Sequence, residues 1–101
     1  MHGNSKKSKK IHHGYEIYEN GRGKKRIVKV GISGGKLNKN GSSPRANGQV
    51  NKWNKQAGYK KYSARVVKRN IRGRERALNW ERGRSIAVRK AGGKMYRHSR
   101  P

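Results

Sequence analysis

The sequence predicts a small α+β domain, in which a three-stranded antiparallel sheet is flanked by helices. Two segments near the N-terminus, 14–19 and 26–33, alternate apolar and polar residues with the period of a strand. Apolar residues recur at helical spacing after Ser43 and again over 75–90, and a β-branched run lies between these two patterns. The predicted order is therefore strand, strand, helix, strand, helix.

The first two strands are predicted to form an antiparallel hairpin. In the first strand, Tyr15 and Ile17 fall on one side and Glu16 and Tyr18 on the other. An Asn-Gly pair follows directly, and this dipeptide is a strong signal for a turn between paired strands. The inward-facing residues of the second strand are predicted to be Val28, Val30 and Ile32.

The first helix is predicted to begin at Ser43-Pro44 and to run to about Gln56. Serine is a favoured N-cap, and proline is favoured at the first helical position. Gly58 is a suitable residue to end the helix. The predicted buried stripe of this helix consists of Ala46, Val50, Trp53 and Ala57.

The second half of the chain predicts one more strand and one more helix. The β-branched run lies in 60–70 and reads as the third strand. Arg72-Gly73-Arg74 is predicted to be the turn that leads out of it. A helix over 75–90 would then end at Gly92-Gly93.

The composition indicates a polyanionic partner. The chain holds 29 Lys and Arg against four Glu, with no Asp, and its formal net charge is +25. Self-repulsion of this size destabilises a compact state on its own, so nucleic acid is the expected partner. With 29% hydrophobic residues and no Phe, the chain is expected to form one small domain over 13–101, preceded by a flexible basic arm or linker over 1–12.

Other classes of protein are excluded by what the sequence lacks. No run of 18 apolar residues is present, so we expect no membrane span, and no apolar segment of the kind found in secretion signals follows the basic N-terminus. The chain has no Cys. It therefore contains neither disulfides nor the thiolates of a zinc ribbon or of a zinc-dependent deaminase.

Glu81 stands out because the helical pattern places it on the buried face of the second helix. When 75–90 is drawn on a wheel at about 100° per residue, Glu81 falls among the apolar residues, whereas Glu75 falls among the arginines and Ile86 on the far side. The apolar arc around Glu81 consists of Ala77, Leu78, Trp80, Ala87, Val88 and Ala91.

A carboxylate on a buried face must be paired or must bind a cation, because burying an unpaired charge is costly. One explanation is an ion pair with Arg74, Arg84 or Arg89. The other is a role as a Mg²⁺ ligand, because one carboxylate with water and substrate phosphate is enough to hold that ion. The sequence alone leaves both explanations open.

Several motifs together resemble the GIY-YIG endonucleases, also called the URI fold. His13-Gly14-Tyr15 looks like the first motif, on the first strand, and Lys29-Val30-Gly31 looks like the second, on its partner. Arg45, just inside the next helix, matches the catalytic arginine of the family, and Glu81 matches its metal-binding glutamate. Over 13–101 the chain more narrowly resembles the C-terminal nuclease toxin domains of Rhs-type bacterial polymorphic toxins.

The resemblance implies a metal-dependent endonuclease that hydrolyses phosphodiester bonds, with DNA the favoured substrate. Glu81 would bind one Mg²⁺ or Mn²⁺, and Arg45 would stabilise the charge that grows on the scissile phosphate. Tyr15 would orient or deprotonate the attacking water. For that role we expect Lys29, Arg45 and the metal to lower the pKa of its phenol, which is about 10 when unperturbed.

The chain departs from the family pattern in three places. Lys29 stands where the second motif usually has a tyrosine, and His13 replaces the first glycine of the first motif. Near the position of the family's C-terminal Asn, the chain offers only His98. The residues predicted to contact the substrate are Tyr18, Lys36, Lys52, Trp80 and His98.

The toxin resemblance also implies a biological setting. The domain would be one part of a larger secreted polypeptide, would act in the cytoplasm of a target bacterium, and would be neutralised by an acidic cognate immunity protein. The main alternative is a non-enzymatic, basic RNA-binding protein of ribosomal type, which accounts for the charge and the small core without any catalytic site. A toxin with another chemistry, such as ADP-ribosylation, is a third possibility.

Overall fold

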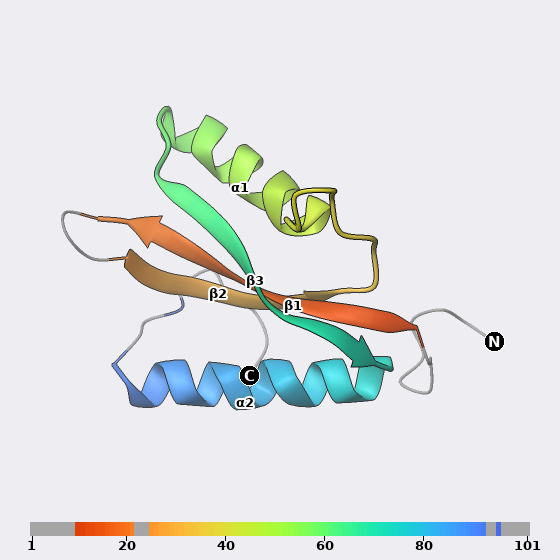
Figure 1. Ribbon diagram of the computed structural model, residues 1–101. Helices are drawn as coiled ribbons and strands as arrows, with labels where there is room; N and C mark the ends of the chain where they lie inside the picture. The colour runs from red at the N-terminus through yellow and green to blue at the C-terminus, as the bar shows by residue number, and fades with distance from the viewer. Residues whose placement is uncertain (1–9, 22–24, 93–94, 96–101) are drawn as a thin grey trace.

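The fold is a three-layer arrangement in which two helices enclose a three-stranded sheet (Figure 1). The structure, a computed structural model, describes residues 10–21, 25–92 and 95. The α+β class and the order strand, strand, helix, strand, helix are confirmed. The elements are β1 (Ile11–Asn20), β2 (Lys25–Ser33), α1 (Pro44–Ala57), β3 (Tyr62–Arg72) and α2 (Arg74–Lys90).

The sheet has the order β2-β1-β3, so the first strand is central and is antiparallel to both neighbours. The predicted hairpin of β1 and β2 is confirmed, with Tyr15 opposite Gly31 and Ile17 opposite Lys29. The register then shifts between Ile17 and Tyr18. Helix α1 covers one face of the sheet and α2 covers the other; Figure 1 shows α1 in yellow-green and α2 in blue, on opposite sides of the strands.

The face under α1, which we call the α1 face, has the larger apolar core. Its buried members come from all three strands and from the inner side of α1, and Trp53 packs against them half-buried. Ala57, which the helical spacing placed in the buried stripe, is exposed in the last turn of α1. The buried members are Tyr15, Ile17, Val28, Ala46, Val50 and Tyr62.

The opposite face, which we call the α2 face, holds two smaller clusters, one around Val30, Val88 and Met95 and one around Ile32, Ile71 and Ala77. Trp80 packs against both clusters.

Two parts of the predicted packing are wrong. Val28 belongs to the α1 face although Val30 and Ile32 belong to the α2 face, because the register shift interrupts the alternation of β2. Ala87 and Ala91 of α2 are exposed, because the stripe that faces the sheet is narrower than the predicted arc. The prediction that Ile86 lies on the far side is confirmed, since 45% of it is exposed.

The predicted ends of α1 are confirmed. The Ser43 hydroxyl accepts a hydrogen bond from the Ala46 amide, and Pro44 occupies the first helical position. Gly58 ends the helix in the left-handed region with φ of 83°, a conformation that glycine adopts without steric cost. This capping fixes where the first turn of α1, with Arg45, meets the sheet.

β1 begins at Ile11, so residues 11 and 12, which the sequence prediction assigned to the arm, belong to the sheet. Ile11 pairs with Arg72 and His12 with Ile71, at the end of β3. Residues 1–9 of the predicted arm lie outside the described residues. Within the described part of the chain, neither helix is long and apolar enough to cross a bilayer.

Candidate functional site

Tyr15 lies at the centre of the α1 face and is only 1% exposed. Its ring crosses over Gly31 on the neighbouring strand, and a Cβ added there would lie 2.4 Å from the phenol oxygen. No side chain fits in that space, so the glycine of the second motif is required for the position of the phenol. The strand partner thus directs the Tyr15 hydroxyl across β2.

Two polar residues of α1 meet the Tyr15 hydroxyl there. The phenol donates a hydrogen bond to Oε1 of Gln49 at 3.3 Å, and the Arg45 guanidinium lies near enough for its interaction with the phenol to lower the pKa of Tyr15. Arg45 and Gln49 are four residues apart and therefore lie on the same face of the helix. The sequence prediction included Arg45 and missed Gln49, although this spacing was a usable signal.

Burial raises the pKa of the Tyr15 phenol, because the phenolate loses its hydration. The Arg45 hydrogen bond and charge and the Gln49 hydrogen bond lower this pKa, while the Glu81 carboxylate raises it further. The expectation of a lowered pKa is therefore wrong for the chain without a bound metal, because desolvation outweighs the neighbouring cation. The Nζ of Lys29 lies 6.0 Å from the Trp53 ring centre.

Glu81 lies on the buried side of α2 as the helical wheel predicts, with 2% of the residue exposed and its Oε2 atom fully buried. Its main-chain carbonyl accepts a hydrogen bond from the Ser85 hydroxyl at 2.7 Å. Its charge acts on the Tyr15 phenol, so residues of β1, α1 and α2 influence one another at this point. Glu75 is exposed, as predicted.

Arg84, one of the three arginines considered as partners of Glu81, pairs with Glu16 instead. Glu16 is fully buried on the α2 face, where it also accepts a hydrogen bond from the Tyr18 hydroxyl at 2.7 Å. Burial, followed by the hydrogen bond and charge of Glu16, raises the pKa of Tyr18 to about 12. The hydroxyl predicted to contact the substrate is thus bonded within the protein, in a network that the sequence prediction did not contain.

His13 connects the strand of Tyr15 to the start of the helix that carries Arg45. Its Nε2 lies 2.7 Å from the Ser43 hydroxyl, and its ring centre is 6.3 Å from that of Tyr15. Burial lowers the pKa of His13, while a hydrogen bond to the main chain of Gly35 raises it and the charge of His12 lowers it. Two residues before Tyr15 on a strand, His13 shares the face of Tyr15, and this spacing could have identified it.

The other predicted substrate contacts lie at different places around the fold. Lys36 follows β2 and lines a hollow at one end of the sheet, and Lys52 is exposed on α1. Trp80 packs over Gly14, where a Cβ would lie 2.3 Å from its ring. His98 lies outside the described residues. The roles of these residues in substrate binding stay predictions.

Glu81 suits a divalent metal ion as a single ligand. Among the residues that the structure describes, no three His, Cys, Asp or Glu side chains gather as a cation cage. Mg²⁺ commonly uses only one or two carboxylates and completes its octahedron with water and substrate phosphate. A buried hard-oxygen donor whose charge acts on Tyr15 fits that pattern.

Comparison with known proteins gives one match. A family model described as URI fold toxin 2 matches residues 5–88, which include β1, β2, α1, β3 and most of α2. None of the curated proteins and none of the solved structures matches the chain.

Proposed function

This chain belongs to the URI fold toxin 2 family, a toxin family with the GIY-YIG-like nuclease fold, and on that premise we propose that it is a metal-dependent endonuclease that hydrolyses phosphodiester bonds of nucleic acid, with DNA as the favoured substrate. The observation that carries the proposal is that the buried Tyr15 phenol hydrogen-bonds Gln49 and that the charges of Arg45 and, more weakly, Glu81 act on its pKa. These groups come from three elements that are distant in the sequence.

Arg45 is the residue that stabilises the transition state in this proposal. It is exposed, and it makes no salt bridge with an acidic side chain of the described residues. A guanidinium of this kind is available to a phosphate, and its donors suit the equatorial oxygens on which negative charge grows during hydrolysis. Lys29, which is half-buried on the same face of the sheet, contributes positive charge.

Glu81 holds the metal ion. Bound there, Mg²⁺ or Mn²⁺ supplies Lewis-acid stabilisation of the phosphate and of the leaving oxygen. The carboxylate itself is held in place by its burial on α2.

Tyr15 acts by orienting the attacking water. Because burial raises its pKa, the phenol keeps its proton near neutral pH in the metal-free chain and donates it to Gln49, which leaves the phenol oxygen to accept a hydrogen bond from the water. Gln49 fixes the direction of the hydroxyl. Orientation of the nucleophile is sufficient for a useful rate gain, because a reacting pair held in the correct geometry avoids a large entropic cost.

The toxin family is consistent with a secreted effector domain. We propose further that the domain is part of a larger polypeptide, acts in the cytoplasm of a target bacterium and is neutralised by an acidic immunity protein. The formal charge of +25 favours rapid, salt-sensitive association with an acidic protein. Size-exclusion chromatography with the acidic product of an adjacent gene should give a stoichiometric complex; the absence of any complex would contradict this part.

A plasmid-nicking assay tests the enzymatic proposal. The parent chain should cleave with Mg²⁺ and lose cleavage with EDTA, and Glu81→Ala should lower the rate by about 10² or more. Glu75→Ala is the matched control, because it removes an exposed glutamate from the same helix and should keep the parent rate. Binding without any metal-dependent cleavage by the parent would instead support the ribosomal-type alternative.

A further inference from the structure

One end of the sheet is hollowed on the side where β1 begins and β2 ends. We call this feature the strand-end hollow; its volume is about 510 Å³. Cationic and imidazole side chains from three segments line it, and no carboxylate does. Its lining includes Ile11, His13, Lys36 and Arg69.

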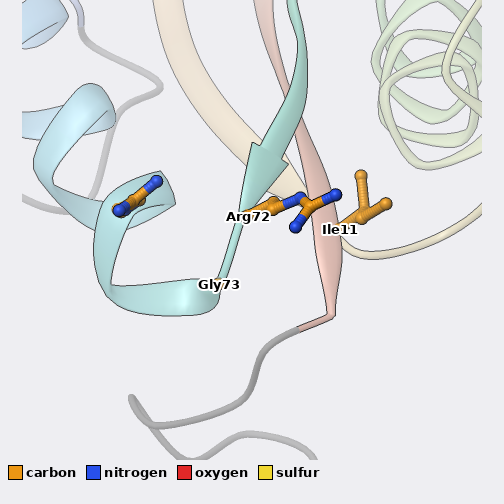
Figure 2. Close-up of a pocket in the computed structure, with 4 residues that line it drawn as sticks. Ile11, Arg72 and Gly73 are labelled. Carbon is orange, nitrogen blue, oxygen red and sulfur yellow. The ribbon is translucent and has the colours of Figure 1, made fainter.

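A second hollow lies around the edge of the same end. It has a volume of about 480 Å³ and is lined by Ile11, Arg72, Gly73 and Arg76, and we call it the arginine hollow. Figure 2 shows it at the junction of β3 and α2, with the side chain of Arg72 directed toward Ile11. This hollow also lacks an acidic lining residue.

Ile11 lines both hollows and is 53% exposed. An exposed apolar side chain between two cationic hollows matches the chemistry of a nucleic-acid strand. Its phosphates alternate along the backbone with the apolar surfaces of sugars and bases.

The strand-end hollow adjoins the candidate site. His13 lines the hollow, and its ring centre lies 6.3 Å from the ring centre of Tyr15. A strand whose scissile phosphate lies at Arg45 and Tyr15 must continue in some direction beyond the site. The direction past His13 leads into a volume that offers Lys36 and Arg69.

We infer that the sugar–phosphate backbone of the substrate runs from the Tyr15–Arg45 site through the strand-end hollow, crosses Ile11 and enters the arginine hollow. This inference rests on the proposed function, because it takes the strand to be cut at Arg45. An acidic protein would also be attracted by the positive charge, but proximity to His13 and Tyr15 favours the substrate.

Matched lysines test the strand-end hollow. Lys36 and Lys39 are both exposed in the segment between β2 and α1, and only Lys36 lines either hollow. With a fluorescein-labelled duplex DNA in EDTA, Lys36→Gln should reduce the slope of log K against log salt concentration by about 1. Lys39→Gln should leave the slope unchanged.

Matched arginine pairs test the arginine hollow in the same way. Arg72→Gln/Arg76→Gln should reduce the salt slope by about 2, because two phosphate contacts are lost. Arg82→Gln/Arg89→Gln removes the same charge from exposed positions that line neither hollow and should keep the parent slope. An equal reduction of the salt slope in the hollow and control variants would overturn the inference. It would show that DNA is attracted by the whole charged surface and not by the hollow.

Ile11→Ala tests the apolar contact, with Ile86→Ala as control because Ile86 is also exposed, at 45%. Ile11→Ala should weaken DNA binding about fivefold, and equally at low and high salt, because burial of apolar surface is not screened. Ile86→Ala should bind as the parent does. Equal affinities of the two variants would remove Ile11 from the path and overturn the inference as stated.

Three further outcomes separate this inference from its alternatives. If the hollow and control arginine variants differ in their binding of poly-glutamate but not in their binding of DNA, the hollows belong to an acidic protein partner. A parent that shows the expected binding pattern but never cleaves overturns the proposed function alone. A parent that cleaves while hollow and control variants bind alike overturns the inference alone.

Discussion

Each face of the sheet holds a phenol of the same strand, buried in the case of Tyr15 and half-buried in the case of Tyr18, and the two phenols have opposite kinds of partner. On the α2 face, Tyr18 bonds Glu16, which pairs with Arg84. On the α1 face, Tyr15 meets Gln49 and Arg45. The first network contains its own anion and cation, whereas the second places an arginine beside a phenol with no acidic residue of α1 nearby.

This difference suggests a division of roles, in which the network on the α2 face stabilises the fold and the residues on the α1 face are available for chemistry. A network with both charges present is satisfied within the protein and fastens α2 to the sheet. A guanidinium without an acidic partner in the described residues can bind a phosphate. Glu81 connects the two faces, because it lies on the helix that the first network fastens and its charge acts on the phenol of the second.

The largest expected effect comes from exchanging the two buried glutamates for glutamine. Glu81→Gln should lower the cleavage rate of the folded protein by about 10² or more, because the proposed metal site loses its carboxylate ligand. Glu16→Gln should instead lower stability by about 1–3 kcal/mol, since Arg84 loses its buried partner. Cleavage by folded Glu16→Gln should remain close to the parent rate.

Nicking kinetics and thermal unfolding on both variants measure this crossed pattern. If Glu16→Gln loses cleavage as completely as Glu81→Gln at a temperature where both are folded, the separation between the faces is wrong. Arg84 is 42% exposed in its side chain, so its charge stays hydrated in Glu16→Gln and the stability loss should be moderate.

The next effect uses the two glycines of β1 and β2 that contact aromatic rings. A Cβ at Gly14 would lie 2.3 Å from the Trp80 ring, and one at Gly31 would lie 2.4 Å from the Tyr15 phenol. Both alanine variants should lose about 1–3 kcal/mol of stability through overpacking. Only Gly31→Ala should also lower the cleavage rate of the folded protein, because it displaces a functional hydroxyl.

Chemical denaturation gives the two stability losses, and nicking assays well below each melting temperature give the rates. Gly48→Ala is the control, because nothing lies within 4 Å of a Cβ at that position of α1. An equal loss of cleavage in Gly14→Ala and Gly31→Ala would mean that Trp80 belongs to the site as fully as Tyr15 does.

The elements of this fold could be predicted from sequence because each has a local signal. Ser43-Pro44 and Gly58 mark the ends of α1, and the predicted bounds of all five elements lie within three residues of those observed. The face of Val28 could not be predicted, because the register shift depends on how β2 pairs with β1 and leaves no mark in the alternation.

The candidate site was predictable to the extent that motifs identify positions. The motifs predict Tyr15, Arg45 and Glu81 as site residues, and the inward direction of Glu81 followed from the helical period. In the metal-free chain the pKa of Tyr15 is raised, whereas the prediction, which included a bound metal, was a lowered pKa; the burial that raises it is a property of the packed structure. The Glu16–Arg84 pair joins residues 68 positions apart and has no local signal at all.

A smaller effect, on the free energy of unfolding at acidic pH, is expected from His13 on the α1 face. Because burial lowers the pKa of His13, the unfolded chain takes up a proton more readily than the folded chain. The contribution of neutral His13 to the free energy of unfolding is therefore complete above about pH 6.5 and is lost as the pH falls below that value. His13→Gln should reduce this loss, and His12→Gln, which keeps His13, should retain it.

Urea denaturation between about pH 7 and pH 5 measures the difference, which for one group is at most about 1.4 kcal/mol per pH unit. The Ser43 hydroxyl, 2.7 Å from Nε2, should still cap α1 in the variant, because it bonds the Ala46 amide independently. Unchanged acid sensitivity in His13→Gln would show that the acid-side loss originates elsewhere.

The smallest effect, on the free energy of unfolding at alkaline pH, is expected from Tyr18 on the α2 face. The pKa of Tyr18 is about 12 in the folded protein and about 10 in the unfolded chain, so its contribution to stability is complete below pH 10 and is lost as the pH rises toward 12. Tyr18→Phe should make the stability fall less steeply over that interval. Tyr59→Phe, which changes a tyrosine that is 62% exposed, should keep the parent slope.

The slope of the unfolding free energy against pH is the quantity to compare, because Tyr18→Phe also loses the hydrogen bond to Glu16 at every pH. Part of the alkaline loss should survive in Tyr18→Phe, since burial raises the pKa of Tyr15 as well. The loss of stability that remains at alkaline pH comes from Tyr15 on the α1 face. A bound divalent ion should reduce this loss, because positive charge favours the Tyr15 phenolate. A slope in Tyr18→Phe that equals the parent slope would contradict the assignment of the Tyr18 hydroxyl to the network with Glu16.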